Sequence, residues 1–173
     1  REHFDKLLDI GPTFERAEMA FYYYGWCLYY LGEPNPARAA FEAYLTFADD
    51  DYDAVFGLGL CALERNDLDG AATHFQRSLD LLDVLIAADP REAPKRVANV
   101  AKAHAGLGDV ALSRGDLPRA REQFETCVRI YPRAYETWFK LFRLYTRLGE
   151  PTLAEEARRQ HEHWQQVVAK DRS

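Results

Sequence analysis

The residues of this chain that could ligate a metal are few, and their spacing is poor for it. His161 and His163 stand two positions apart in a helical pattern, where their side chains diverge, whereas histidines at i and i+4 converge. The run Asp49–Asp51, followed by Asp53, lacks the spacing and the glycine of a calcium loop. We interpret the histidines as surface residues and the acidic run as a solvated turn, and we expect no metal.

Residue patterns for nucleophilic or phosphate chemistry are also missing. Cys27, Cys61 and Cys127 are too few and too scattered for a disulfide framework or a zinc site. All three sit in apolar helical patterns, so we expect small core residues. Gly106-x-Gly108 lacks the strand context of a phosphate loop, and no nucleophile elbow is found. We therefore expect no enzyme activity, no catalytic residue and no cofactor.

Composition restricts the class of protein further. The chain has 173 residues, 47% of them apolar, which is enough for one domain with a core and argues against disorder. No apolar run reaches the ~18 residues that span a bilayer, so membrane insertion is not expected. The net charge of −6 argues against a nucleic-acid partner. Acidic residues predominate over residues 1–113 and basic residues over 114–173.

The start of the chain and the ratio of arginine to lysine say little about the source of the protein. The chain starts at Arg1 without an initiator methionine or a signal-peptide pattern, which suggests a cut fragment. The compartment stays open, with a soluble cytoplasmic protein favoured over a periplasmic one. The excess of arginine over lysine hints at a bacterial source.

A thirty-four-residue period orders the apolar residues. Ala37-x3-Phe41 recurs thirty-four residues later as Ala71-x3-Phe75, and Ala120-x3-Phe124 has the same form. Gly25 recurs as Gly59 at the same offset. In each first helix the large, apolar and small residues fall at i, i+3, i+4 and i+7, which is one face of a helix. The glycines allow two helix backbones to approach closely, so a bulkier residue should overpack the contact.

This pattern resembles the tetratricopeptide repeat, whose signature is a large residue, Leu-Gly, Tyr, Ala, Phe and Pro in a helix–turn–helix unit. The copy with Leu107-Gly108, Ala120, Phe124 and Tyr131-Pro132 fits best, and in the fourth copy Arg158 replaces the aromatic. The resemblance implies an all-α fold, a right-handed α-solenoid of stacked helix–turn–helix repeats (an α-α superhelix). The expected single domain, 1–173, contains repeats 18–51, 52–85, 101–134 and 135–168.

Two segments fall outside this frame. Residues 86–100 are inserted between the second and third repeats. We interpret them as helical extensions that form a projecting antiparallel hairpin, and a plain loop insertion is the alternative. Residues 1–17 carry Phe4, Leu7, Leu8 and Ile10 before Gly11-Pro12. They read as the second helix of an upstream half repeat that caps the first repeat.

In this family the first helices line a concave groove that holds the partner. The residue after each packing position lies on the adjacent stripe of its helix, about 100° around. By this rule, the partner-binding groove has aromatic and apolar residues from the first two repeats and largely basic residues from the last two. Its residues are Tyr22, Trp26, Tyr29, Phe56, Leu60, Leu63, Asp109, Phe139, Lys140, Arg143 and Arg147.

The segment from Phe21 to Tyr30 is aromatic nearly all the way round a helix, and such a helix is normally buried on every side. Three accounts stay open. The aromatics pack under the N-terminal helix, they anchor a partner in the groove, or they form a homodimer seam. In the second account Trp26→Ala weakens partner binding at little cost to stability.

The expected partner is a protein or peptide with apolar anchors and some acidic residues. The Lys, Asn and Arg clamp with which some family members hold a C-terminal carboxylate is absent, because Tyr22, Trp26 and Gly57 stand in its place. The predicted function is a protein–protein interaction scaffold. The alternatives are the interaction module of a larger multidomain enzyme or regulator, and a self-associating structural repeat domain.

Overall fold

The structure is a computed structural model that describes residues 17–171, and all regular secondary structure in this range is helical. The described residues form two compact units divided between Leu81 and Leu82. The expected capping helix at 1–17 falls almost wholly outside the described residues. No helix within 17–171 is both long enough and apolar enough to cross a bilayer.

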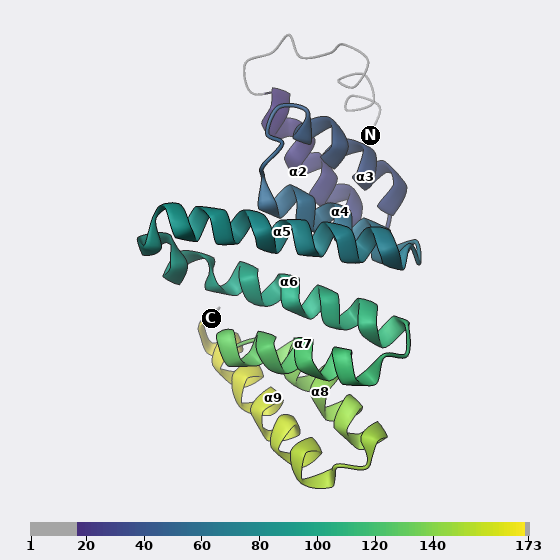
Figure 1. The fold of residues 1–173 in the computed structure, drawn as a ribbon, viewed down its shortest axis with the longest axis vertical. Helices are drawn as coiled ribbons and strands as arrows, with labels where there is room; N and C mark the ends of the chain where they lie inside the picture. The colour runs from purple at the N-terminus through teal and green to yellow at the C-terminus, as the bar shows by residue number, and fades with distance from the viewer. Residues whose placement is uncertain (1–16, 172–173) are drawn as a thin grey trace. The chain divides into compact units, whose positions relative to one another are not determined.

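The first unit consists of two helix pairs. Its helices are α2 (Ala17–Tyr30), α3 (Pro34–Leu45), α4 (Tyr52–Glu64) and the first part of α5 (Leu68–Ala88). Helix α3 packs against both α2 and α4 (Figure 1). The core of this unit is formed by apolar side chains of α2, α3 and α4, namely Phe21, Leu28, Ala37, Ala40, Phe41, Tyr44, Ala54, Leu58 and Cys61.

The second unit has the same construction. After the end of α5 and the 3-10 turn η1 (Pro90–Glu92) come α6 (Ala93–Ser113), α7 (Leu117–Ile130), α8 (Tyr135–Leu148) and α9 (Pro151–Asp171). Helix α7 packs on α6 and α8, and α8 packs on α9 (Figure 1). The buried cluster of this unit contains Ala111, Ala120, Phe124, Val128, Leu141, Leu144, Tyr145, Ala154 and Ala157.

Short turns between the helices follow from local chemistry. Gly32, Gly115 and Gly149 each have a φ near +75°, a left-handed conformation in which a side chain is strained. Gly149 ends α8 and Pro151 begins α9, as expected from the sequence. Asp51, from the acidic run, caps α4 by accepting hydrogen bonds from the backbone N–H groups of Asp53 and Ala54.

Each helix pair of the first three repeats is held by a phenylalanine ring against a glycine. A Cβ added to Gly25 would lie 2.7 Å from the ring of Phe41, and one added to Gly59 would lie 2.6 Å from Phe75. Gly108 meets Phe124 in the same way. These rings are fully buried. The prediction that the glycines occupy equivalent places and permit close helix approach is therefore confirmed.

The fourth pair lacks the contact between a glycine and a phenylalanine ring. Phe142 stands thirty-four residues after Gly108, and Arg158 stands thirty-four residues after Phe124. Phe142 packs against the core of the second unit from α8, whereas Arg158 is exposed on α9 and pairs with Glu155 and Glu162. In this pair the phenylalanine ring that packs against the core comes from α8, and α9 carries an exposed arginine at the equivalent position.

Helices α5 and α6 are longer than those around them. Each has 21 residues, whereas α2, α3, α4, α7 and α8 have 12 to 14. The insertion is helical up to Ala88 and again from Ala93, and the turn between them is capped by Asp89, which accepts a hydrogen bond from the N–H of Arg91. The projection of these two ends as a hairpin stays a prediction.

Candidate partner-binding surface

Helix α2 has three faces that differ in burial. Phe21 and Leu28 are buried in the core, with Tyr24 packed against them. Tyr22, Trp26 and Tyr29 are half-buried on a second face, which we call the aromatic face. The aromatic stretch is therefore not enclosed on every side in the described residues, and the predicted groove residues of α2 form one face of it.

Rings on the aromatic face contact one another edge to face. The centroids of Tyr22 and Trp26 are 6.5 Å apart, and those of Trp26 and Tyr29 are 6.1 Å apart. Trp26 also lies edge-on against the buried ring of Phe41, at 5.2 Å between centroids. This contact argues against the expectation that Trp26→Ala leaves stability almost unchanged, because Trp26 supports the core as well as offering surface.

The Tyr22 hydroxyl joins the first helices of two adjacent repeats. It donates a hydrogen bond of 2.6 Å to the carboxylate of Asp53 on α4. Burial, together with the hydrogen bond and charge of Asp53, holds the pKa of Tyr22 above its ordinary value, and the Trp26 indole acts in the opposite direction. The aromatic face is thus fixed by a polar bond at its N-terminal end.

The predicted groove residues of α4 are less available than those of α2. Phe56, Leu60 and Leu63 are half-buried, and the ring of Phe56 lies 5.3 Å from that of Phe75 between centroids. They offer apolar edges to solvent and no free polar group. In a binding surface they would provide apolar contacts beside the rings of Tyr22, Trp26 and Tyr29.

In the second unit, two predicted groove residues form an ion pair. Lys140 Nζ of α8 lies 2.7 Å from a carboxylate oxygen of Asp109 on α6, and 5.6 Å from the ring centroid of Phe124. Burial raises the pKa of Asp109 above its ordinary value, while Lys140 acts in the opposite direction. Neither group is therefore free to meet a partner's charge.

The remaining predicted residues lie along one exposed line on α8. Phe139, Arg143 and Arg147 are spaced four residues apart and all are exposed. Phe139 contacts the rings of Phe142 and His161, whereas the two guanidinium groups have no carboxylate partner among the described residues. We call these three residues the arginine stripe.

Sequence reasoning missed the bonds that join adjacent first helices. Tyr22 and Asp53 are thirty-one residues apart, and so are Asp109 and Lys140. This separation is three residues, or about one helical turn, shorter than the thirty-four-residue period. Residues at this separation therefore face each other from the first helices of two adjacent repeats. These bonds could have been predicted from the sequence, because complementary polar residues stand thirty-one positions apart in both cases.

Two expectations for the chemically active residues are corrected. Cys27 is exposed, whereas Cys61 and Cys127 are buried as expected. His161 is half-buried, and its Nδ1 donates a 2.8 Å hydrogen bond to the carbonyl oxygen of Tyr135, so it is a structural residue and not a surface one. No cluster of metal-ligating side chains occurs within the described residues.

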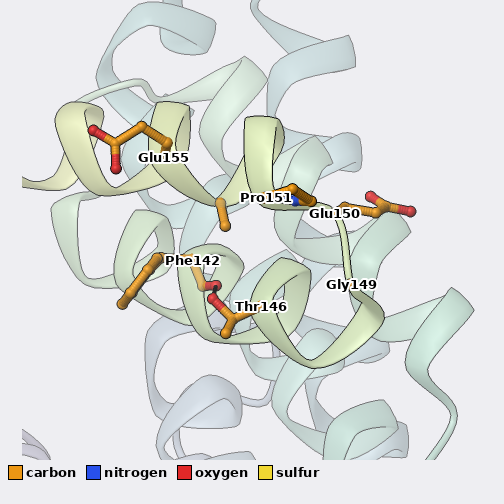
Figure 2. A pocket seen from close by; sticks show the side chains of 7 residues that line it. Phe142, Thr146, Gly149, Glu150, Pro151 and Glu155 are labelled. Atoms are coloured by element: carbon orange, nitrogen blue, oxygen red, sulfur yellow. Dashed lines mark hydrogen bonds between the residues drawn. The ribbon is translucent and has the colours of Figure 1, made fainter.

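A pocket of about 260 Å³ lies at the turn between α8 and α9 (Figure 2). Figure 2 shows Phe142 and Thr146 contributed by α8, and Pro151 and Glu155 by α9, with Gly149 at the turn. Its two carboxylates are already engaged, because Glu150 pairs with Arg121 and Glu155 pairs with Arg158. The pocket therefore offers no unpaired charge to a small ligand.

Comparison with known proteins supports the repeat reading. The tetratricopeptide repeat family model matches residues 25–93, 83–135 and 105–163. The crystal structure of MamA is similar with a TM-score of 0.70 at 20% identity, covering 96% of this chain and 87% of that one. TTC0263, a thermophilic tetratricopeptide repeat protein of Thermus thermophilus, is similar with a TM-score of 0.58 at 24% identity, covering 83% and 72%. No curated protein matches.

Proposed function

Because the chain belongs to the tetratricopeptide repeat family, whose repeats are protein-interaction scaffolds, we propose that it binds a partner protein segment through its first helices. The segment carries apolar anchors and acidic residues. The observation that carries this proposal is the arginine stripe, where Arg143 and Arg147 stand exposed and without carboxylate partners among the described residues, beside the exposed ring of Phe139.

Charge on α8 favours an acidic partner. Lys140 is neutralised by Asp109, so the cations of the predicted groove left for a partner are Arg143 and Arg147. Two arginines at i and i+4 repel each other by roughly 0.2–0.5 kcal/mol in an isolated helix. A carboxylate placed between them removes this repulsion and accepts two charge-assisted hydrogen bonds. Other arginines of the second unit, such as Arg121 and Arg158, already hold glutamates.

The dimensions of the stripe define the segment that fits it. Phe139 and Arg147 are eight residues apart, which is roughly 12 Å along a helix. An extended chain covers this distance in about four residues. A segment lying along α8 would therefore place one apolar residue and two acidic residues within about four positions.

The aromatic face on α2 is the proposed anchor for further apolar residues. Tyr22, Trp26 and Tyr29 are half-buried and already held in place by ring contacts, so they lose little conformational entropy on binding. This supports a role as pre-organised anchors.

A random twelve-residue peptide library displayed on phage, selected on the immobilised chain, tests the proposal. Enriched peptides are expected to combine an apolar residue with two acidic residues within about four positions. Selection is repeated on Arg143→Glu/Arg147→Glu and on the matched control Arg119→Glu/Arg129→Glu, in which the same charge is changed on exposed residues of α7. Enrichment that ignores acidic residues, or that survives on the first variant, contradicts the proposal.

A further inference from the structure

The pocket at the turn between α8 and α9 has apolar walls and satisfied polar side chains (Figure 2). Phe142, Pro151 and Ala154 line it with carbon. The hydroxyl of Thr146 donates a 2.8 Å hydrogen bond to the carbonyl oxygen of Phe142, four residues earlier on α8. The two carboxylates that line the pocket are held by arginines. A group bound here would therefore gain free energy by burying apolar surface and not by meeting a charge.

Two residues smaller than leucine open this pocket. At the places of Thr146 and Pro151 the third repeat has Leu112 and Leu117, which both pack against the core of the second unit. The pocket volume of about 260 Å³ exceeds the ~150 Å³ in which an apolar protein cavity holds a benzene molecule. Small-molecule sites usually begin near ~300 Å³. The pocket is therefore sized for one side chain with a ring, and not for a cofactor.

The third repeat shows what covers the same edge when another repeat follows. Arg121 is the counterpart of Glu155, and its guanidinium lies 5.3 Å from the ring centroid of Tyr145 and pairs with Glu150. The Tyr145 ring is buried. An aromatic ring and a carboxylate from the following repeat thus lie against the start of α7. A ring with a nearby carboxylate is therefore the kind of group that this architecture places at such an edge.

The pocket lies beside the arginine stripe. Phe142 and Thr146 each stand one residue before an arginine of the stripe on α8, and neighbouring residues of a helix point about 100° apart. The ring centroid of Phe142 lies 6.1 Å from that of Phe139, the apolar residue of the stripe. A chain segment on the stripe could therefore send one side chain into the pocket. The positive charge of the two arginines selects a segment with carboxylates.

From these observations we infer that the pocket holds an aromatic side chain of the acidic partner segment, at a position next to the residue whose carboxylate meets Arg147. This inference rests on the proposed function and adds a specificity site to it. The site lies outside the row of first helices, because α9 supplies Pro151 and Ala154. Inside the pocket, the partner's ring would contact the ring of Phe142, and aromatic pairs are more stable than their buried area alone implies.

Methyl resonances of the pocket test this contact directly. The probe is the peptide most enriched by phage selection on the unaltered chain, and it is expected to carry an aromatic residue within about two positions of an acidic one. The full chain is labelled with ¹³C in its threonine and alanine methyl groups. The ring current of the peptide should shift the methyl resonances of Thr146 and Ala154, while that of Thr73 on α5 stays in place. A peptide with alanine at the aromatic position should leave all three unshifted.

A second measurement fills the pocket from α8. Thr146→Phe places a ring where the partner's ring would bind, so the dissociation constant of the fluorescently labelled peptide should rise at least about ten-fold. Thr73→Phe is the matched control. Thr73 is an exposed helical threonine whose hydroxyl donates the same kind of hydrogen bond, to the carbonyl oxygen of Asp69 four residues earlier. This control should bind with the affinity of the unaltered chain.

Three results would overturn the inference, namely selected peptides without an aromatic residue, methyl resonances of Thr146 and Ala154 that do not shift, and equal affinity for the two threonine variants. Arg143→Glu/Arg147→Glu separates this inference from the proposed function. Binding that is lost on this variant and kept on Thr146→Phe would retain the arginine stripe and remove the pocket from the site. Binding that is kept on both would contradict the proposed function as well.

Discussion

The hydroxyl of Tyr22 on α2 donates a 2.6 Å hydrogen bond to the carboxylate of Asp53 on α4. This bond links two adjacent repeats on the face proposed to receive a partner. It ties the orientation of an anchoring ring to the packing of the repeats, so the anchor is in place before binding.

Replacing Tyr22 by phenylalanine removes this bond and keeps the ring. We expect Tyr22→Phe to lower the free energy of unfolding by about 1–2 kcal/mol, since hydrogen bonds to charged groups are stronger than neutral ones. Tyr23→Phe is the control, because it changes the hydroxyl of the exposed neighbouring residue, and it should change stability little. Urea unfolding followed by circular dichroism measures both. Equal losses in the two variants would show that the Asp53 bond contributes nothing.

The glycine–phenylalanine contacts predict strong coupling between two positions. Gly59→Ala places a methyl group 2.6 Å from the ring of Phe75 and should cost about 1–3 kcal/mol by overpacking. In the double variant Gly59→Ala/Phe75→Leu, the smaller side chain leaves room for the methyl group. A double-mutant cycle from urea unfolding should therefore give a favourable coupling energy of roughly 1 kcal/mol. Strictly additive losses would contradict the close contact.

Stability should depend on pH through Asp109. Its pKa is raised by burial, so its contribution to stability is fully present below its ordinary value near 3.8 and is lost as pH rises through the folded-state pKa. Lys140 limits this loss by pairing with the carboxylate. Lys140→Met should therefore cost on the order of 1 kcal/mol at pH 7.

At lower pH the cost of Lys140→Met should shrink, because Asp109 takes up a proton and no longer needs its partner. Urea unfolding at a series of pH values from neutral into the acid range measures this difference. Arg143→Met is the control, since Arg143 has no carboxylate partner among the described residues, and its effect should not vary with pH. A cost of Lys140→Met that is constant with pH would rule out the ion pair as its cause.

The different burial of Phe142 and Arg158 in the fourth repeat predicts different sensitivities to substitution. Phe142→Ala removes half-buried ring surface from the core and should cost ~1–3 kcal/mol. Arg158→Ala removes only exposed ion pairs on α9 and should leave the melting temperature unchanged. Differential scanning calorimetry compares the two. A larger loss for Arg158→Ala would mean that α9 is held by its surface charges.

Much of the fold could be predicted because the same contact between two helices recurs in successive repeats. A glycine is followed by a phenylalanine at the same separation in three repeats, as Gly25 and Phe41, Gly59 and Phe75, and Gly108 and Phe124. This recurrence within one chain indicates helix pairs without any alignment. The turn between α8 and α9 could be predicted from residue type, because Gly149 adopts a left-handed conformation after a helix and Pro151 suits the start of the next one.

Features that depend on a particular neighbour could not be predicted in this way. Cys27 and Cys61 occupy the same position of the repeat, yet only Cys61 is buried, because α3 covers α4. His161 looked like a surface residue, but its bond to the Tyr135 carbonyl depends on how α9 folds back on α8. The pairing of Lys140 with Asp109 is different, because complementary residues thirty-one positions apart were a signal in the sequence that was overlooked.

The predicted groove was named residue by residue from helix periodicity alone. Periodicity places Phe139, Arg143 and Arg147 on one line of α8, but it does not show which cations are already paired. The ion pair between Lys140 and Asp109 supplies that information, and it leaves two arginines as the proposed cationic contacts with a partner. The partner itself is specified only by chemistry, as an apolar and acidic segment.

The most direct test of partner binding is the dissociation constant of a library-selected, fluorescently labelled peptide, measured by anisotropy. We predict that Arg143→Glu/Arg147→Glu weakens binding by at least about ten-fold, since two charge-assisted contacts become repulsive. The matched variant Arg119→Glu/Arg129→Glu should bind with the affinity of the unaltered chain. Equal affinity for all three proteins would contradict the account, because the exposed arginines of α8 would then have no part in recognition.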